Sequence, residues 1–394
     1  MTSELAYAIV TPYTIRKSRT GAVLARLLGS TSAQLIAARL VSLTRENADD
    51  YAESIVSTPD PDANKLREVI REYIRESIGP DKDGGRRRAL LLVFKGENAR
   101  REISDVAGSL TISCDSGDTI RNAYGDLVWN DDGSVRFFEP AILISDISHD
   151  PQQEMSMWLK FLKDQSPLME GFCSYNNPEK VQQTLVLIKP DCWRQRSGRA
   201  GNILDMFSRT GLRIIGCKLC FLSTAQAVEF YKPVKDALRK KLAPGIGEKA
   251  KETLEHKFNF TLPDSAAKEL TDDVGIPYAD EQFEKIVEFM SGRRPSQCPP
   301  EKYEAPGLVP TLGLVYEGEQ AVNKIRDVLG PTDPTQAPAG TVRREFGSDV
   351  MVNTAHASDS PENAQREMDI IDMRQSNCET NIKKELKECT QNDT

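Results

Sequence analysis

Residues 184–207 read TLVLIKPDCWRQRSGRAGNILDMF, and residues 6–28 read AYAIVTPYTIRKSRTGAVLARLL. Each stretch has an apolar, β-rich run, a proline, a basic loop and then a glycine followed by an amphipathic helical pattern. Further apolar runs follow in the same order in both halves, at 34–43 and 89–94 in the first and at 212–222 and 311–318 in the second. Self-similarity over this length indicates duplicated domains rather than a solenoid.

The order of elements expected in each half is strand, helix, strand, strand, helix, strand. This is the ferredoxin-like arrangement, with helices packed on an antiparallel sheet. The sequence therefore predicts an α+β fold of two ferredoxin-like (βαββαβ) α/β sandwich domains. We expect them at 1–163 and 183–377, joined by a polar, turn-rich linker at 164–182. A mostly helical insertion is expected at about 233–306, and a polar tail at 378–394 is either a frayed helix or disordered.

Composition limits the partners of the chain. Its 394 residues carry a net charge of −8, which argues against a general nucleic-acid partner, although local basic runs would suffice for an anionic substrate. No apolar run is long enough to cross a bilayer, and the N-terminal pattern is not that of a signal peptide, so we expect no membrane association and a cytoplasmic location. The eight cysteines are scattered. Cys217 and Cys220 form the single CxxC, which indicates buried thiols rather than a zinc site.

Residues 346–367, FGSDVMVNTAHASDSPENAQRE, contain His356, one of only three histidines. The apolar run at 350–352 predicts a short buried strand, and the residues after His356 predict a turn and a helix start. A neutral imidazole at a strand end is a nucleophile that needs little activation near pH 7. His356 is therefore a candidate carrier of a covalent intermediate, and the alternative is a structural core histidine.

With this motif in view, the second half resembles the nucleoside diphosphate kinase family. The motif NTAHASD fits that family's N-x-x-H-[GA]-S-D pattern. The segments that carry the resemblance stand in the expected order: LVLIKPD at 185–191, VLGPTDP at 328–334, GTVRREF at 340–346 and NTAHASD at 353–359. The resemblance implies transfer of the terminal phosphate of a nucleoside triphosphate, such as ATP or GTP, to a nucleoside diphosphate. The route would be ping-pong through phosphohistidine at His356, with Mg²⁺ carried by the nucleotide phosphates.

Four residues of this half suit a phosphate chain. Lys189 follows an apolar strand, where an ammonium can reach anionic oxygens as a point charge. Arg326 and Arg343 carry planar guanidinium groups that can donate two hydrogen bonds to one phosphate. Thr332 can donate its hydroxyl. Each alone would be a surface charge or a turn cap, so their phosphate role depends on the spacing shared with the family.

The resemblance also assigns supporting roles. It places Asn353 at the ribose hydroxyls and Tyr231 near the histidine. Ser358 and Glu367 would orient the imidazole and set its tautomer. The alternatives are a strand-end turn former for Asn353 and an exposed helical residue for Glu367.

Base recognition would rest on stacking, which tolerates every base because each has a π-face. Val350 fits the apolar side of such a stack. Phe283 and Tyr278 are both candidates for the aromatic side, and the sequence does not choose between them. The chain has no Gly-x-x-x-x-Gly-Lys loop, so the phosphates must be held by side chains.

The first half lacks this chemistry. Thr11 stands where Lys189 is expected, and Leu143 stands in place of His356, although Arg121 matches Arg343. His149 comes six positions too late in a polar turn, and is at most a displaced nucleophile. This half is expected to be a degenerate, built-in partner, and the chain a homo-oligomer in which three chains form a hexamer-like assembly.

A competing interpretation is a non-catalytic, nucleotide-binding interaction or regulatory protein that keeps the fold. The degenerate first half and the long insertion favour it, whereas the complete set of residues around His356 favours the enzyme. Relay of the phosphate from His356 to another protein is a narrower alternative.

Overall fold

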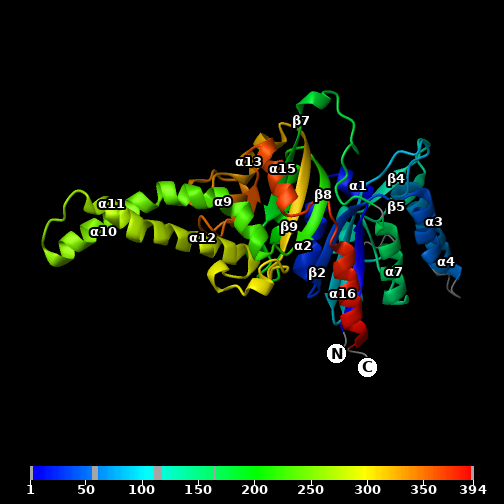
Figure 1. Cartoon of the computed structure of the whole chain (residues 1–394). Helices are drawn as coiled ribbons and strands as arrows, with labels where there is room; N and C mark the ends of the chain where they lie inside the picture. The colour runs from blue at the N-terminus through cyan, green and yellow to red at the C-terminus, as the bar shows by residue number, and fades with distance from the viewer. Residues whose placement is uncertain (1–2, 56–60, 111–117, 164, 392–394) are drawn as a thin grey trace. The chain divides into compact units, whose positions relative to one another are not determined.

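The structure, a computed structural model, describes residues 3–55, 61–110, 118–163 and 165–391. It divides into two compact units, one made of Met1–Leu219 with Leu312–Thr394 and the other of Cys220–Thr311 (Figure 1). The first unit contains an eight-stranded sheet with the strand order β10-β7-β9-β8-β2-β3-β1-β6.

The first half of the sheet comes from the N-terminal part of the chain. Its elements are β1 (Glu4–Val10), α1 (Pro12–Arg16), α2 (Thr20–Ser30), β2 (Gln34–Val41), α3 (Arg45–Ser54), α4 (Pro61–Tyr73), a π-helical turn (Ile74–Ile78), β3 (Ala89–Gly96), α5 (Ala99–Ala107), α6 (Ile120–Tyr124), β4 (Asp126–Trp129), β5 (Val135–Glu139), β6 (Ile142–Ile144) and α7 (Pro151–Leu162). Within the described residues, strands β4 and β5 pair with each other and with no other strand, as a separate hairpin.

The second half repeats this order. Its elements are β7 (Val181–Ile188), a 3₁₀ turn (Pro190–Cys192), α8 (Arg199–Ser208), β8 (Arg213–Cys220), β9 (Thr311–Glu319), α13 (Ala321–Leu329), α14 (Val342–Phe346), β10 (Ala355–Ala357), α15 (Pro361–Ile370) and α16 (Cys378–Gln391). In each half the first strand has two antiparallel neighbours: β1 lies between β3 and β6, and β7 lies between β9 and β10. The prediction of two ferredoxin-like domains is therefore confirmed.

Local sequence signals explain where the helices begin. The Thr11 side chain accepts from the backbone N–H of Thr14 and caps α1, whose first residue is a proline. Ser360 caps α15 in the same way, again with proline in the first turn. The strands between the helices are runs of buried apolar residues, which indicates that both faces of the sheet are covered.

The two halves of the sheet meet where β2 pairs with β8, at Arg39 opposite Lys218. Arg39 is only 1% exposed and pairs with Glu379 at 2.6 Å. Lys218 Nζ donates to the carbonyl oxygens of Ile371 and Asp372, at 3.0 and 2.8 Å. Both buried cations at this junction thus have partners from the C-terminal end of the chain.

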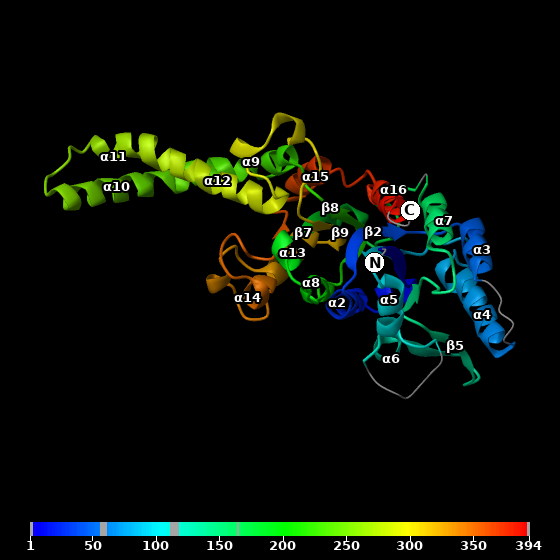
Figure 2. The ribbon, with the colours of Figure 1, turned by 90° about the horizontal axis from the view of Figure 1, so that it is seen from below.

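Helices α2 and α8 lie side by side (Figure 2). Their contact requires glycine on both sides. A Cβ added to Gly21 would lie 2.3 Å from the backbone nitrogen of Asp205, and one added to Gly201 would lie 2.1 Å from that of Ala25. Because these neighbours are backbone atoms, no side-chain movement could relieve the overlap.

The C-terminal segment forms a helix, α16, which contacts β2 and α7 of the first half (Figures 1 and 2). Cys378 and Ile382 belong to the buried cluster that also contains Tyr51 and Trp158. Of the two possibilities left open by the sequence, a helix is the one observed, and it is packed rather than frayed over its first turns.

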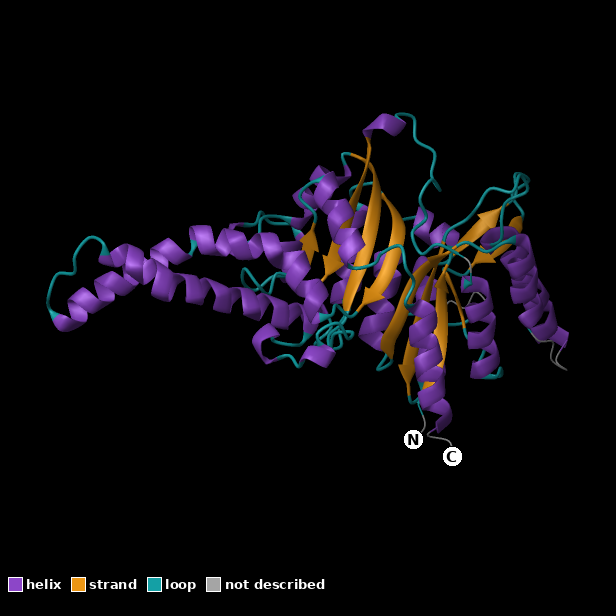
Figure 3. Cartoon of the chain, viewed as in Figure 1, coloured by secondary structure: helices purple, strands orange, loops and turns teal. Residues whose placement is uncertain are grey.

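The second unit is mostly helical, as expected for the insertion (Figure 3). Its elements are α9 (Thr224–Lys241), α10 (Ala243–Phe258), α11 (Ala266–Leu270), a π-helical turn (Thr271–Gly275), α12 (Ile276–Ser291) and two 3₁₀ turns, Pro295–Gln297 and Pro300–Lys302. Helix α12 packs along α9, and α10 packs against α11 and the π-helical turn. Among the described residues, no helix combines the length and the apolar character needed to span a membrane.

Candidate active site

His356 lies in the middle of β10, opposite Leu187 of β7. The prediction of a buried strand at 350–352 is wrong, because these residues form bends and Val350 is 61% exposed. Asp349 Oδ1 accepts from the backbone N–H groups of Met351 and Val352, both at 2.8 Å, which folds the run into a turn. The strand begins only at Ala355, directly after Thr354, whose φ of 70° lies in the left-handed region.

A carboxylate and a hydroxyl hold the imidazole. His356 Nε2 lies 2.9 Å from Glu367 Oε2, and Ser358 Oγ donates to the same oxygen at 2.6 Å. Glu367 is 5% exposed on α15, and the His356 side chain is 22% exposed. An ionised carboxylate can only accept hydrogen bonds, so Nε2 carries the hydrogen and the ring lone pair is on Nδ1.

Lys189 is placed directly beside this strand. Its backbone N–H donates to the Thr354 carbonyl at 2.8 Å, and its Nζ donates to Asn353 Oδ1 at 2.7 Å. Burial, followed by the nearby Arg343 guanidinium, lowers the pKa of Lys189 to about 8. Asn353 is itself buried, and its amide donates to the carbonyls of Thr332 and Val350. The amide therefore links the strand end to the loop expected to hold phosphate.

Arg343 is also buried, on α14. Its Nη1 donates to the Gly330 carbonyl at 3.0 Å and its Nη2 to the carbonyl of Ala355, the neighbour of His356, at 3.1 Å. Arg326 and Thr332 are exposed, one in the last turn of α13 and the other in the loop that follows Gly330. The first unit thus places two buried cations near His356: Lys189 and Arg343 each donate to a backbone carbonyl within two residues of it.

Tyr231 and Phe283 belong to the second unit. Tyr231 is buried on α9. Phe283 is 4% exposed on α12, and Lys235 Nζ lies 5.2 Å from its ring centroid. Tyr278, the other aromatic candidate, is 43% exposed. Stacking of a base on Phe283 stays a prediction, and Tyr278 has the more accessible ring.

The structure singles out one residue of this site to which the sequence assigned no role. Asp191 is buried in the 3₁₀ turn after Lys189, and within the described residues neither carboxylate oxygen accepts from another residue. Burial raises the pKa of Asp191, while Lys189 opposes that shift. Its position in the quoted IKPD segment was the signal that could have drawn attention to it.

The first half keeps the frame of this site without its nucleophile. Leu143 lies opposite Ile9, the register that His356 occupies opposite Leu187. Arg121 donates to the carbonyls of Gly108 and Ile142, just as Arg343 does to Gly330 and Ala355. A cavity of about 320 Å³ opens here; its lining includes Tyr51, Ser104, Arg121 and Leu143.

Two residues that the sequence analysis compared with the second half have partners within the first. Thr11, at the position of Lys189, donates to Glu139 at 2.8 Å. His149 Nδ1 lies 3.6 Å from Glu154 Oε1, off the strand end, and Glu154 also forms an ion pair with Arg100 at 3.1 Å.

Comparison with known proteins identifies the same region. A family model described as "Nucleoside diphosphate kinase" matches residues 182–240 and 301–375, which leaves out most of the helical unit. The nucleoside diphosphate kinase of Staphylothermus marinus is 30% identical over 191 residues, 48% of this chain and 92% of the relative. That of Campylobacter jejuni is 32% identical over 192 residues, 48% of this chain and 95% of the relative.

A crystal structure of an NDP kinase from Pyrobaculum aerophilum aligns with 27% identity and a TM-score of 0.34, over 48% of this chain and 94% of that one. The two sequence relatives match over nearly their whole length at 30% and 32% identity. The chain belongs to the nucleoside diphosphate kinase family.

Proposed function

We propose that this chain transfers the terminal phosphate of a nucleoside triphosphate to a nucleoside diphosphate through a phosphohistidine at His356. The observation that carries the proposal is the contact between His356 Nε2 and Glu367, because it fixes the tautomer that leaves the lone pair on Nδ1. Family membership supports the reaction class.

The reaction has two displacements. The Nδ1 lone pair attacks the γ-phosphorus of the triphosphate, an N–P bond forms, and the bond to the bridging oxygen breaks with its electrons leaving on the nucleoside diphosphate. After the diphosphates exchange, a terminal phosphate oxygen of the second one attacks the phosphohistidine. The N–P electrons then return to Nδ1. Glu367 stabilises the positive charge that the ring gains when the N–P bond forms and loses when that bond breaks.

Charge compensation comes from cations already in place. Lys189 and Arg343 are buried next to the strand that carries His356, so they need little reorganisation when a phosphate arrives. We propose that Arg326 and Thr332, which are exposed, complete the phosphate contacts. Stabilisation of spread negative charge is the main task of a protein in phosphoryl transfer.

For the nucleoside, we propose that Asn353 meets the ribose hydroxyls and that Val350, which is 61% exposed, covers one face of the base. Phe283 or Tyr278 would cover the other face. We further propose that Tyr231 hydrogen-bonds the imidazole or the phosphate when nucleotide is bound. Ser358 acts through Glu367 by donating to its carboxylate.

Mg²⁺ enters the proposal as part of the substrate. The side chains proposed for the phosphates are cationic, amide or hydroxyl groups, which are not a carboxylate set for Mg²⁺. Among the described residues, no group of three or more His, Cys, Asp or Glu side chains is arranged to hold a metal ion. The donor set therefore fits an ion held by the nucleotide phosphates, with which it neutralises charge.

We also propose that the chain is built as a tandem pair, with the first half as an inactive partner. The shared eight-stranded sheet and the α2–α8 contact support this, because like halves are joined edge to edge. Three such chains would then form a hexamer-like homo-oligomer. Light scattering should give about three times the 43.9 kDa chain mass, and a monomeric mass would rule the oligomer out.

The test of function is exchange between ATP and a second nucleoside diphosphate, run beside labelling with γ-³²P ATP. We expect turnover and an acid-labile, base-stable phosphoenzyme, both abolished by His356→Asn. If the protein binds nucleotide without any exchange, the non-catalytic regulatory interpretation is correct instead.

A further inference from the structure

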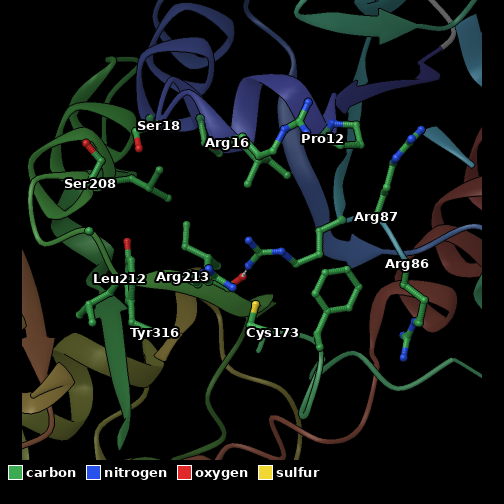
Figure 4. Close-up of a pocket in the computed structure, with 18 of the residues that line it drawn as sticks. Pro12, Arg16, Ser18, Arg86, Arg87, Cys173, Ser208, Leu212, Arg213 and Tyr316 are labelled. Atoms are coloured by element: carbon green, nitrogen blue, oxygen red, sulfur yellow. Dashed lines mark hydrogen bonds between the residues drawn. The ribbon is translucent and has the colours of Figure 1, made fainter. Parts of the chain in front are cut away.

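The first unit contains a second cavity, of about 730 Å³, outside the candidate active site. Its walls come from α1, the loop before β3, residues 172–174, the end of α8, the start of β8 and Tyr316 of β9 (Figure 4). None of the residues proposed above for nucleotide binding lines it. Cavities of this volume accommodate ligands of nucleotide size or larger.

Positive charge is concentrated in this cavity. Five arginines line it: Arg16, Arg86, Arg87, Arg88 and Arg213. Among the described lining residues Asp81 alone carries a carboxylate, and its Oδ1 accepts from the backbone N–H groups of Asp83 and Gly85. Within the described parts of the chain, none of the five arginines forms an ion pair. In a chain with a net charge of −8, such a cluster needs a specific explanation.

Aromatic and backbone contacts hold several of these guanidinium groups. Those of Arg86 and Arg88 lie 5.3 and 5.4 Å from the centroid of the Phe172 ring. Arg213 lies 5.1 Å from the centroid of the Tyr175 ring. Arg88 also donates to the Ile214 carbonyl. A guanidinium that stacks on a ring keeps its N–H edge for an anion, so the site is partly organised in advance.

The arginines also repel one another. Burial lowers the pKa of Arg88; Cys173 opposes this shift and Arg213 adds to it. Burial likewise lowers the pKa of Arg87; Asp81 opposes this shift and Arg16 adds to it. A cluster of like charges in a partly enclosed space costs folding free energy, which an anion with several charges would relieve.

The shape of the site limits the kind of anion. A single phosphate can occupy the forks of only one or two guanidinium groups, whereas five line this cavity. A long nucleic acid would require a basic track along the surface rather than an enclosed cluster. We propose that this cavity binds a small anion that carries several phosphate groups, either a nucleoside polyphosphate or a polyphosphorylated non-nucleotide.

Cys173 provides a local probe, because it lines the cavity and is partly exposed. The rate at which iodoacetamide alkylates Cys173 is measured by peptide mass spectrometry on the full chain at ~0.15 M salt. Inorganic tripolyphosphate, ATP and inositol hexakisphosphate are the three ligands, and a poly-aspartate peptide is the control for negative charge without phosphate. Cys298, also partly exposed but in the second unit, is the internal reference.

We expect tripolyphosphate to slow alkylation of Cys173 and to leave Cys298 unchanged. Protection by ATP but not by inositol hexakisphosphate supports a nucleotide as the ligand, and protection by both supports recognition of phosphates alone. Absence of protection by all three at millimolar concentration overturns the proposal. Protection by a poly-aspartate peptide alone also overturns it.

Two matched double variants distinguish binding in this cavity from a general effect of the charge of the protein. Arg16→Met with Arg86→Met removes two exposed lining cations and should raise the half-protecting concentration by about tenfold or more. Lys240→Met with Lys241→Met removes the same charge from α9, which contributes nothing to the lining, and should change it less than about twofold. Equal effects of the two pairs would contradict a built site.

Discussion

Replacement of Glu367 by glutamine tests the proposed role of the carboxylate with little change of shape. The wild-type oxygen accepts from His356 Nε2 at 2.9 Å and from Ser358 Oγ at 2.6 Å. Hydrogen bonds to charged acceptors contribute about 1.5–3 kcal/mol, against about 0.5–1.5 kcal/mol for neutral ones. The variant therefore loses roughly 1–2.5 kcal/mol of stabilisation as the ring becomes positive, which corresponds to a rate lower by about 5- to 70-fold.

The assay is rapid-quench measurement of phosphoenzyme formation at saturating ATP, which isolates the first displacement from product release. Glu362→Gln is the control, because this residue lies in the first turn of the same helix and is exposed. It should react within about twofold of the wild type. A rate for Glu367→Gln that is as high as the control's would refute the claim that the carboxylate sets the tautomer and the charge of His356.

Three further perturbations test the site and the fold. The pKa of Lys189 is lowered to about 8, so the side chain loses its charge as the pH rises through that value, and kcat/KM should fall above pH 8. In Lys189→Arg the fall in kcat/KM should move to higher pH, because arginine stays charged. Identical pH profiles for the two proteins would count against a phosphate role for Lys189. Gly201→Ala places a methyl group 2.1 Å from backbone and should destabilise by about 1–3 kcal/mol in urea unfolding, whereas Gly245→Ala, with no atom within 4 Å, should not destabilise. Ile382→Ala removes a fully buried side chain of α16 and should cost about 2–5 kcal/mol, while Lys383→Ala on the exposed side should change little; equal midpoints would mean that α16 is dispensable.

Much of the fold could be predicted because its signals are local. Alternating strand and helix patterns and the prolines after β1 and β7 are legible from a few residues each. The grouping of His356, Ser358 and Glu367 was also predictable, because all three lie within twelve residues of sequence and the family motif fixes their spacing.

The features that the sequence did not reveal depend on distant or competing interactions. The apolar run at 350–352 has the composition of a strand, but the backbone N–H groups of Met351 and Val352 donate to the Asp349 side chain and not to a neighbouring strand. Packing of α16 on the first half depends on Arg39 and Glu379, which lie 340 positions apart. The β4–β5 hairpin has an irregular register and, among the described residues, pairs with no further strand. Such tertiary contacts override local preference, so periodicity alone does not identify them.

The central claim is that the nitrogen atom Nδ1 of His356 carries the phosphate between the two nucleotides. Its most direct test is ³¹P NMR with tandem mass spectrometry of the chain after brief exposure to Mg·ATP, with the phosphate located by residue and by ring nitrogen. We predict a single phosphorylated residue, His356, modified on Nδ1 and dephosphorylated on addition of a nucleoside diphosphate. A stable phosphate on any other residue, or on Nε2 of His356, would contradict the account.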